Sequence, residues 1–224
     1  MFIVYVITIF PEAFPGNLDV SLIGKARREN KWCLNLIDLK KHAIKKKKLD
    51  SRPFGGGPGM IIRADVLQSA LNEIESNLSS ETFKRMEKII LSPRGSPLNQ
   101  ITVCKLSKLA GLILICGRYE GVDERFISHN NLNQISIGDF ILMGGEVASM
   151  ALVEGVIRIL PSVIGNPKSV REESFNNGML EHPQFTKPRV WNNKEVPKVL
   201  LSGNHKKIAE WKKNNSKPVK KNNS

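Results

Sequence analysis

Cysteine is scarce in this chain of 224 residues, which has three cysteines and no C-x-x-C pair. The four histidines lie far apart along the sequence and show no metal-ligand spacing. These absences argue against a disulfide framework and a zinc site, and we expect no dedicated protein site for a metal. Few, unevenly spaced cysteines are typical of proteins from a reducing compartment, so we expect a cytoplasmic protein.

Long hydrophobic runs are also missing. No apolar stretch reaches the roughly 20 residues that a membrane-spanning helix requires. The apolar segment Phe2–Phe10 lacks a basic region before it and a small-residue cleavage site after it, and Pro11-Glu12 ends it. We therefore interpret it as a buried first strand rather than a signal peptide, and expect no membrane partner.

The common nucleotide-binding motifs are absent from the glycine-containing loops. None of these loops reads G-x-G-x-x-G or G-x-x-x-x-G-K-[ST]. Neither a dinucleotide nor a nucleoside triphosphate therefore fits the usual signatures.

Positive charge is abundant and unevenly placed. The formal net charge is +13; residues 40–48 carry six lysines and no acid, and residues 205–224 carry seven lysines and one glutamate. Nearly all of the excess lies in these two segments, which favours a polyanionic partner such as RNA or DNA. The alternative is that the lysines only solubilise a loop and a tail.

Apolar runs alternate with helical periodicity along the first two thirds of the chain. Strands are predicted at 2–10, 32–37, 89–91, 112–116 and 135–137, and helices at 21–29, 65–78, 99–110 and 148–160. Strands that alternate with helices predict an α/β domain with a largely parallel sheet.

The domain organisation follows from composition. Residues 1–160 form the predicted α/β domain, and the Pro- and Gly-containing residues 161–178 form a linker. Residues 179–213 form a small helical C-terminal domain, in which Asn204 caps a helix over His205–Lys213. Residues 214–224 lack core-forming side chains and are predicted to be a disordered basic tail.

Three predicted strands end in glycine-containing polar loops: LSPRGS at 91–96, CGRYEG at 116–121 and SIGDFILMGGEVA at 136–148. Ligands of parallel α/β sheets bind at the carboxyl ends of the strands, and glycine allows the backbone to approach a ligand closely. Each loop alone is more often a simple turn, but three in series predict a binding pocket.

Five motifs together resemble the bacterial tRNA (guanine-N1)-methyltransferases, a branch of the knotted (SPOUT) methyltransferase superfamily. They are RPFGGGPGM, SPRG, GRYEGVDER, SIGDF-x-L-x-GGE and VLLSGNH, in the family's order, and the resemblance runs from Met1 to about Lys213. It implies an α/β fold with a deep C-terminal trefoil knot and a homodimer with active sites shared between subunits.

The activity that the resemblance implies is transfer of a methyl group from S-adenosylmethionine to N1 of the guanine 3′ of the anticodon, position 37 of tRNA. The family is also associated with magnesium, without a dedicated protein site. The resemblance places the methyl donor against fourteen residues: Ile90, Leu91, Ser92, Pro93, Gly117, Tyr119, Glu120, Ser136, Ile137, Gly138, Phe140, Leu142, Gly144 and Gly145. Glu120 would attract the cationic end of the donor; the alternative is an ion pair with Arg118 or Arg125.

The catalytic residues implied by the resemblance are Glu173, as the general base, and Arg158, which would face the guanine. The family has aspartate at the position of Glu173, and Glu172 beside it is an alternative base. A salt bridge with Glu154 is the alternative role of Arg158. The implied substrate-binding residues are Arg52, Gly55, Gly56, Gly57, Pro58, Gly59 and Ser174.

Two other functions stay open at this stage. One is a related knotted methyltransferase that acts on a ribose or on rRNA, for which a carboxylate at Glu173 is not required. The other is a non-catalytic RNA-binding protein that has kept the scaffold but does not bind the donor.

Overall fold

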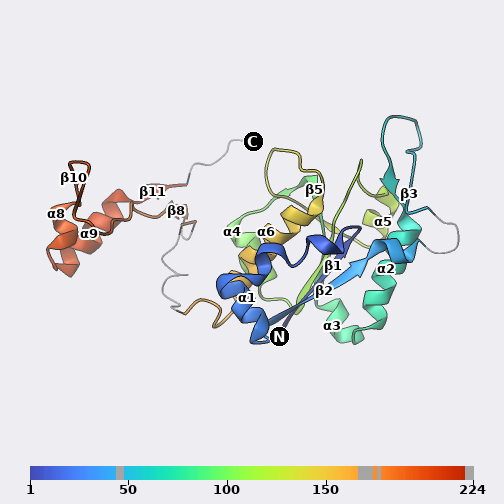
Figure 1. Ribbon diagram of the computed structural model, residues 1–224, viewed down its shortest axis with the longest axis horizontal. Helices are drawn as coiled ribbons and strands as arrows, with labels where there is room; N and C mark the ends of the chain where they lie inside the picture. The colour runs from blue at the N-terminus through green and yellow to red at the C-terminus, as the bar shows by residue number, and fades with distance from the viewer. Residues whose placement is uncertain (44–47, 166–173, 176–177, 220–224) are drawn as a thin grey trace. The chain divides into compact units, whose positions relative to one another are not determined.

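A computed structural model describes residues 1–43, 48–165, 174–175 and 178–219 of the chain (Figure 1). The chain divides into two compact units, Met1–Ile164 and Gly165–Ser224. Each unit is described by itself below. The boundary falls within the predicted linker, and Glu172 and Glu173 lie outside the described residues.

The first unit is built on a five-stranded sheet in which every neighbouring pair of strands is parallel. The strand order is β2-β1-β6-β5-β7. The strands are β1 (Phe2–Thr8), β2 (Trp32–Asp38), β5 (Met86–Pro97), β6 (Gly111–Ile115) and β7 (Asn133–Ser136), with a separate two-stranded pair β3 (Asp50–Ser51) and β4 (Ile61–Ile62).

Six α-helices and three short 3-10 helices accompany these strands in the part of the first unit that the structure describes. They are η1 (Pro11–Ala13), η2 (Gly16–Asp19), α1 (Ser21–Arg28), η3 (Leu39–His42), α2 (Ala64–Ser76), α3 (Ser80–Lys84), α4 (Gln100–Leu106), α5 (Glu124–His129) and α6 (Gly145–Arg158).

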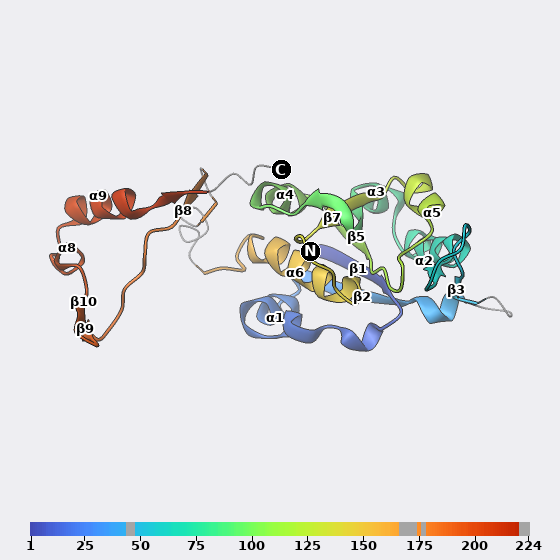
Figure 2. The same ribbon diagram turned by 90° about the horizontal axis from the view of Figure 1, so that it is seen from above.

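The sheet is covered on both faces, which is why its strands are apolar throughout. Successive side chains of a strand point to opposite faces, so Val4 and Val6 of β1 join one core while Tyr5 and Ile7 join the other. The first core is shared with α1, α4 and α6, and the second with α2 and α5. Figure 2 shows these two groups of helices on opposite sides of the sheet.

Strand β5 departs from the predicted strand at 89–91. It runs on to Pro97, and both Leu91 and Ser96 are paired with Ile135 of β7. The residues between them, Ser-Pro-Arg-Gly, therefore bulge out of the ladder and return to it. A bulge of this kind redirects side chains at the end of a strand, and here it lies at the carboxyl edge of the sheet.

The second unit has short elements: β8 (Met179–Leu180), β9 (Val190–Trp191), β10 (Lys194–Glu195), α8 (Lys198–Leu201), α9 (His205–Asn215) and β11 (Lys217–Pro218). The predicted cap of α9 is confirmed, because Asn204 Oδ1 accepts a hydrogen bond from the backbone N–H of Lys207 at 3.1 Å. Trp211 of α9 packs edge-on against the rings of His182 and Phe185.

The start of the predicted disordered tail is ordered in the structure. Helix α9 continues to Asn215, and Lys217–Pro218 pairs antiparallel with Met179–Leu180. This segment lacks core-forming side chains, and it is ordered by its backbone pairing with β8. Residues 220–224 lie outside the described part of the chain.

Two glycines allow a stability test of this architecture. A Cβ on Gly111, at the start of β6, would collide with the carbonyl oxygen of Ile3 in the neighbouring strand. We expect Gly111→Ala to lower the free energy of unfolding by about 2–3 kcal/mol, because the two strands must separate to admit the methyl group. Urea denaturation followed by circular dichroism measures the change.

The matched control is Gly155→Ala within α6. Its Cβ would lie 3.6 Å from Val103 Cγ1, an ordinary contact. Alanine is the better helix former, so this variant should be more stable than the wild type by about 0.5–1 kcal/mol. Equal effects of the two substitutions would contradict the packing described here.

Candidate functional site

A cavity of about 780 Å³ opens at the carboxyl edge of the parallel sheet, between the loops that follow β5, β6 and β7. The volume lies within the range of small-molecule sites. All fourteen residues predicted to contact the methyl donor line it: Ile90, Leu91, Ser92, Pro93, Gly117, Tyr119, Glu120, Ser136, Ile137, Gly138, Phe140, Leu142, Gly144 and Gly145.

The loops after β6 and β7 are joined through their backbones. The N–H of Gly145 donates to the carbonyl of Gly117 at 2.9 Å, and Arg118 pairs with Gly144 in an isolated antiparallel bridge. A Cβ on Gly145 would lie only 2.8 Å from the Cα of Cys116, and one on Gly144 would collide with the Arg118 side chain. Glycine at 145 therefore allows the two backbones to meet, and glycine at 144 leaves the space that the Arg118 side chain occupies.

A buried carboxylate connects these loops to the central strand. Glu146, in the first turn of α6, is only 2% exposed. Its Oε1 accepts a hydrogen bond from Thr8 Oγ1 at 2.8 Å, and its Oε2 accepts from Arg118 Nε at 2.9 Å. A buried charge is stable only when it is paired and hydrogen-bonded, and Glu146 meets both conditions.

Arg118 makes further contacts that hold it against the protein. It donates to the carbonyl oxygen of Met143 at 3.3 Å, and its guanidinium lies 4.5 Å from the centre of the Phe10 ring. The alternative ion pair of Glu120 with Arg118 or Arg125 is therefore not the arrangement observed, because Arg118 pairs with Glu146 and Arg125 with Asp123.

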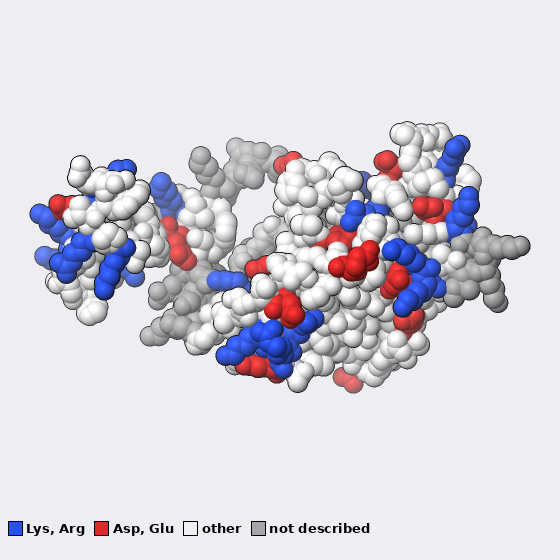
Figure 3. Space-filling model, in the orientation of Figure 1, with Lys and Arg blue, Asp and Glu red and all other residues white. Residues whose placement is uncertain are grey.

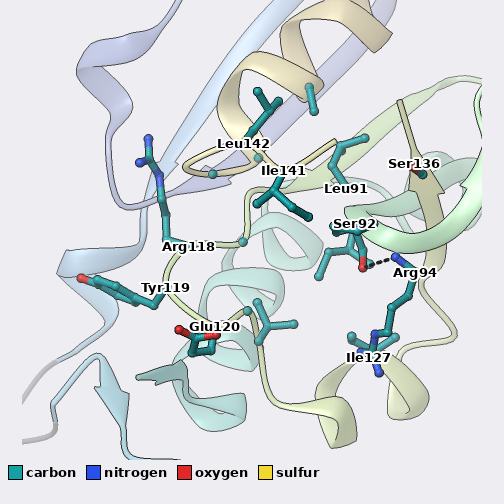
Figure 4. Close-up of a pocket in the computed structure, with 18 of the residues that line it drawn as sticks. Leu91, Ser92, Arg94, Arg118, Tyr119, Glu120, Ile127, Ser136, Ile141 and Leu142 are labelled. Atoms are coloured by element: carbon teal, nitrogen blue, oxygen red, sulfur yellow. Dashed lines mark hydrogen bonds between the residues drawn. The ribbon is translucent and has the colours of Figure 1, made fainter. Parts of the chain in front are cut away.

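The walls of the cavity differ in character. Figure 4 shows Arg118, Tyr119 and Glu120 on one wall, and Leu91, Ser92 and Arg94 on the opposite one. Ile141 and Leu142 lie between them. A ligand with an apolar ring and a charged end suits such a site.

Two more carboxylates line the cavity, and each is held by an arginine. Asp123 Oδ2 lies 2.7 Å from Arg125 Nη2, and Glu124 Oε2 lies 2.7 Å from Arg94 Nη2. The hydrogen bonds from Arg125 lower the pKa of Asp123 and favour its charged form. Asp123 is consequently a weak proton acceptor.

Cys116 does not supply a nucleophile. It is buried beneath the cavity, where its sulfur contacts the hydroxyl of Ser149 at 3.2 Å. Burial raises the pKa of Cys116 to about 12, so the thiolate is not formed near neutral pH.

The predicted substrate loop, RPFGGGPGM, needs its glycines for backbone reasons. Gly55, Gly56, Gly57 and Gly59 all have positive φ angles between 81° and 110°. A side chain at any of them would be strained. Gly59 also lies against the side chain of Glu120, which brings this loop to the cavity.

Several cavity residues were missed from the sequence. Phe54, at the tip of the substrate loop, lines the cavity and is 98% exposed. A second pocket of about 720 Å³ adjoins the first. Pro53 and Phe54 line both pockets, whereas the predicted substrate-binding residue Arg52 lines only the second. An aromatic residue within a glycine-rich loop is the signal that would have indicated Phe54.

Of the two predicted catalytic residues, only Arg158 belongs to the described part of the chain, and it does not line this cavity. Arg158 is exposed at the last turn of α6, about 20 Å along the helix axis from Gly145. Its alternative partner Glu154 accepts a hydrogen bond from Asn17 at 2.8 Å. Ser174 belongs to the second unit, where its hydroxyl accepts from the backbone N–H of Glu181 at 3.1 Å.

Within the described residues, no group of three or more His, Cys, Asp or Glu side chains could hold a metal ion. No helix in the same residues has the length and apolar character required to cross a membrane.

Comparison with known proteins shows which family this chain resembles in sequence. The family described as "tRNA (Guanine-1)-methyltransferase TrmD" matches residues 2–223. A protein of Ehrlichia canis named "tRNA (guanine-N(1)-)-methyltransferase" is 47% identical over 215 residues, which cover 95% of this chain and 89% of that relative. A protein of Pelagibacter ubique with the same name is 45% identical over 96% of this chain and 91% of its own length.

A protein of Ruegeria pomeroyi with this name is 44% identical over 96% of this chain and 87% of that relative. The match extends over the sheet, the three loops and the second unit alike. Together with the parallel α/β sheet and the cavity at its carboxyl edge, these similarities establish that the chain belongs to the tRNA (guanine-1)-methyltransferase family.

Proposed function

We propose that this protein transfers a methyl group from S-adenosylmethionine to N1 of the guanine 3′ of the anticodon, position 37 of tRNA. The observation that carries the proposal is the convergence of three glycine-containing loops on one cavity in a chain of this family. tRNA as the substrate makes the cytoplasm the expected location.

The residues of the cavity suit S-adenosylmethionine, which supplies an electrophilic methyl group when bound. Ile90, Leu91 and Leu142 offer apolar surface for an aromatic base. A Cβ built on Gly117 would meet no atom within 4 Å, so the backbone there is open to a ligand. Glu120 contributes a negative charge that favours a sulfonium cation.

Methylation of guanine N1 requires a base, because N1 carries a proton in the neutral nucleobase. Asp123 is poorly suited to accept it, because the hydrogen bonds from Arg125 lower its pKa. We assign this role to Glu173, in the predicted linker segment 161–178, and assign Arg158 to stabilising the charge that develops on O6. Arg52, Gly55–Gly59 and Ser174 would contact the guanine and its neighbours.

We propose that the active enzyme is a homodimer with shared sites. Arg158 lies about 20 Å from the cavity end of its own helix, so it would serve the cavity of a partner subunit. The loop before α6 exposes Ile141 and Met143 by 79% and 88%, apolar surface that a second subunit would cover. A two-fold dimer is the commonest closed arrangement.

A trefoil knot also belongs to the proposal. The chain leaves β7 at the edge of the sheet and returns to Gly117 before entering α6. Helix α6 then packs into the same core as α1 and α4. We propose that this segment passes through the loop formed by residues 92–116, which would tie the chain into a knot.

The substrate assignment is tested with two unmodified tRNA transcripts, one with guanine and one with adenine directly 3′ of the anticodon. We expect incorporation of labelled methyl groups only into the first, because adenine N1 carries no proton and no O6 accompanies it. Nuclease digestion and mass spectrometry identify the product. A 2′-O-methylated ribose in place of 1-methylguanosine would contradict the proposal.

Glu173→Gln removes the proposed base while keeping its size. We expect kcat for the guanine transcript to fall by about 10²–10⁴-fold, and the Kd for S-adenosylmethionine measured by calorimetry to stay within about twofold. Glu172→Gln is the control and should retain kcat. If the neighbouring substitution alone abolishes turnover, the base is Glu172.

Gly117→Val adds a branched side chain at a cavity-lining position where a Cβ would meet no protein atom within 4 Å. The variant should fold with the wild-type melting temperature but lose calorimetric heat on addition of S-adenosylmethionine, corresponding to at least about a 100-fold weaker Kd. Retained donor binding would show that the donor lies elsewhere.

A further inference from the structure

The hairpin of β9 and β10 exposes a tryptophan. Trp191 is 64% exposed, whereas Trp32 is fully buried and Trp211 packs against two aromatic rings. The hairpin projects from the helices of its unit in both ribbon views (Figure 1 and Figure 2). A large aromatic side chain held in solvent at such a position is suited to contact a partner.

The turn of this hairpin has a defined backbone geometry. Asn192 and Asn193 have φ angles of 47° and 58°. Positive φ at both central residues defines the two-residue turn that matches the twist of a β-hairpin, and asparagine tolerates that conformation. The N–H of Val196 donates to the carbonyl of Arg189 at 3.0 Å and continues the pairing. The backbone that carries Trp191 is therefore ordered before a ligand binds, which limits the backbone entropy lost on binding.

Charge is divided between the two faces of the hairpin. Lys194 is directly opposite Trp191, and residues opposite one another share a face. Arg189 lies two residues before Trp191 and so has its side chain on the same face. The acid Glu195 is opposite Val190, on the other face. One face thus presents an indole with a cation on each side.

The surroundings of this face are basic as well. Residues 178–219 contain nine Lys or Arg residues and three Asp or Glu residues. Figure 3 shows many of these basic side chains on the surface of the C-terminal unit. The partner that complements such a face is a polyanion with exposed flat rings.

We propose that the face formed by Arg189, Trp191 and Lys194 is a stacking site for an unpaired nucleotide of the RNA substrate. The base stacks on the indole, and the two cations contact the phosphates on either side of it. This inference rests on the proposed function, because it takes its RNA from that reaction. Bases inside a duplex are already stacked and cannot use the site.

Tryptophan fluorescence tests the stacking directly. We expect a single-stranded RNA oligonucleotide to quench the emission of the wild-type protein and to have little effect on Trp191→Phe, which keeps the other two tryptophans. A fully paired RNA of the same length should leave the wild-type emission nearly unchanged. Equal quenching by the paired RNA would overturn the proposal.

Steady-state kinetics with the guanine-bearing transcript give an independent measure. Trp191→Ala should raise the KM for tRNA by about tenfold, the loss expected for one base–aromatic stack, with kcat changed less than about twofold. Trp191→Phe should restore most of the affinity. Lys194→Gln should reduce the slope of log KM against log salt by about 0.7–0.9, the value of one phosphate contact.

The control is Glu195→Gln on the opposite face of the same hairpin, for which KM should stay within about twofold of the wild type. A wild-type KM for Trp191→Ala would overturn the stacking site while leaving the proposed function intact. Quenching by single-stranded RNA without methylation of the guanine transcript would overturn the proposed function alone. If the tryptophan emission per molecule falls as the concentration of the protein alone rises, a second copy of the chain covers the face, and this too would overturn the proposal.

Discussion

The ion pair between Glu146 and Arg118 is the interaction on which the cavity depends. It joins the loop after β6 to the first turn of α6, and Thr8 ties the same carboxylate to the central strand. Because Glu146 is almost completely buried, removal of the Arg118 charge would leave a buried carboxylate without its partner, at a cost of about 3–5 kcal/mol. The loops are therefore held in place before any ligand arrives, which reduces the entropy lost on binding.

Parallel strands determine where this interaction lies. All five strands end at the same edge of the sheet, so loops that are distant in the sequence meet there. The backbones meet so closely that a Cβ on Gly145 would lie only 2.8 Å from the Cα of Cys116. The glycine at 145 is therefore needed for the close contact between the two backbones, whether or not a ligand is bound.

The proposed reaction distributes its parts over the chain. The donor cavity belongs wholly to the first unit, whereas the proposed base Glu173 and the basic hairpin at Trp191 belong to the second. The exposed apolar loop around Ile141 and Met143 is consistent with a second subunit completing each site.

The amino-acid sequence by itself determined the alternation of strands and helices and the three glycine-containing loops, whereas the fourteen residues that line one cavity were implied only by the resemblance to the family. Apolar periodicity and glycine motifs are local, so they can be recognised without the fold. The tertiary structure decided the partner of Arg118, the double pairing of Ile135 and the position of Phe54 at the cavity. The hydrogen bond from Thr8 to Glu146 joins residues 138 positions apart. A local sequence pattern does not indicate which distant side chain will become the partner of a buried group, because folding decides which groups are buried together.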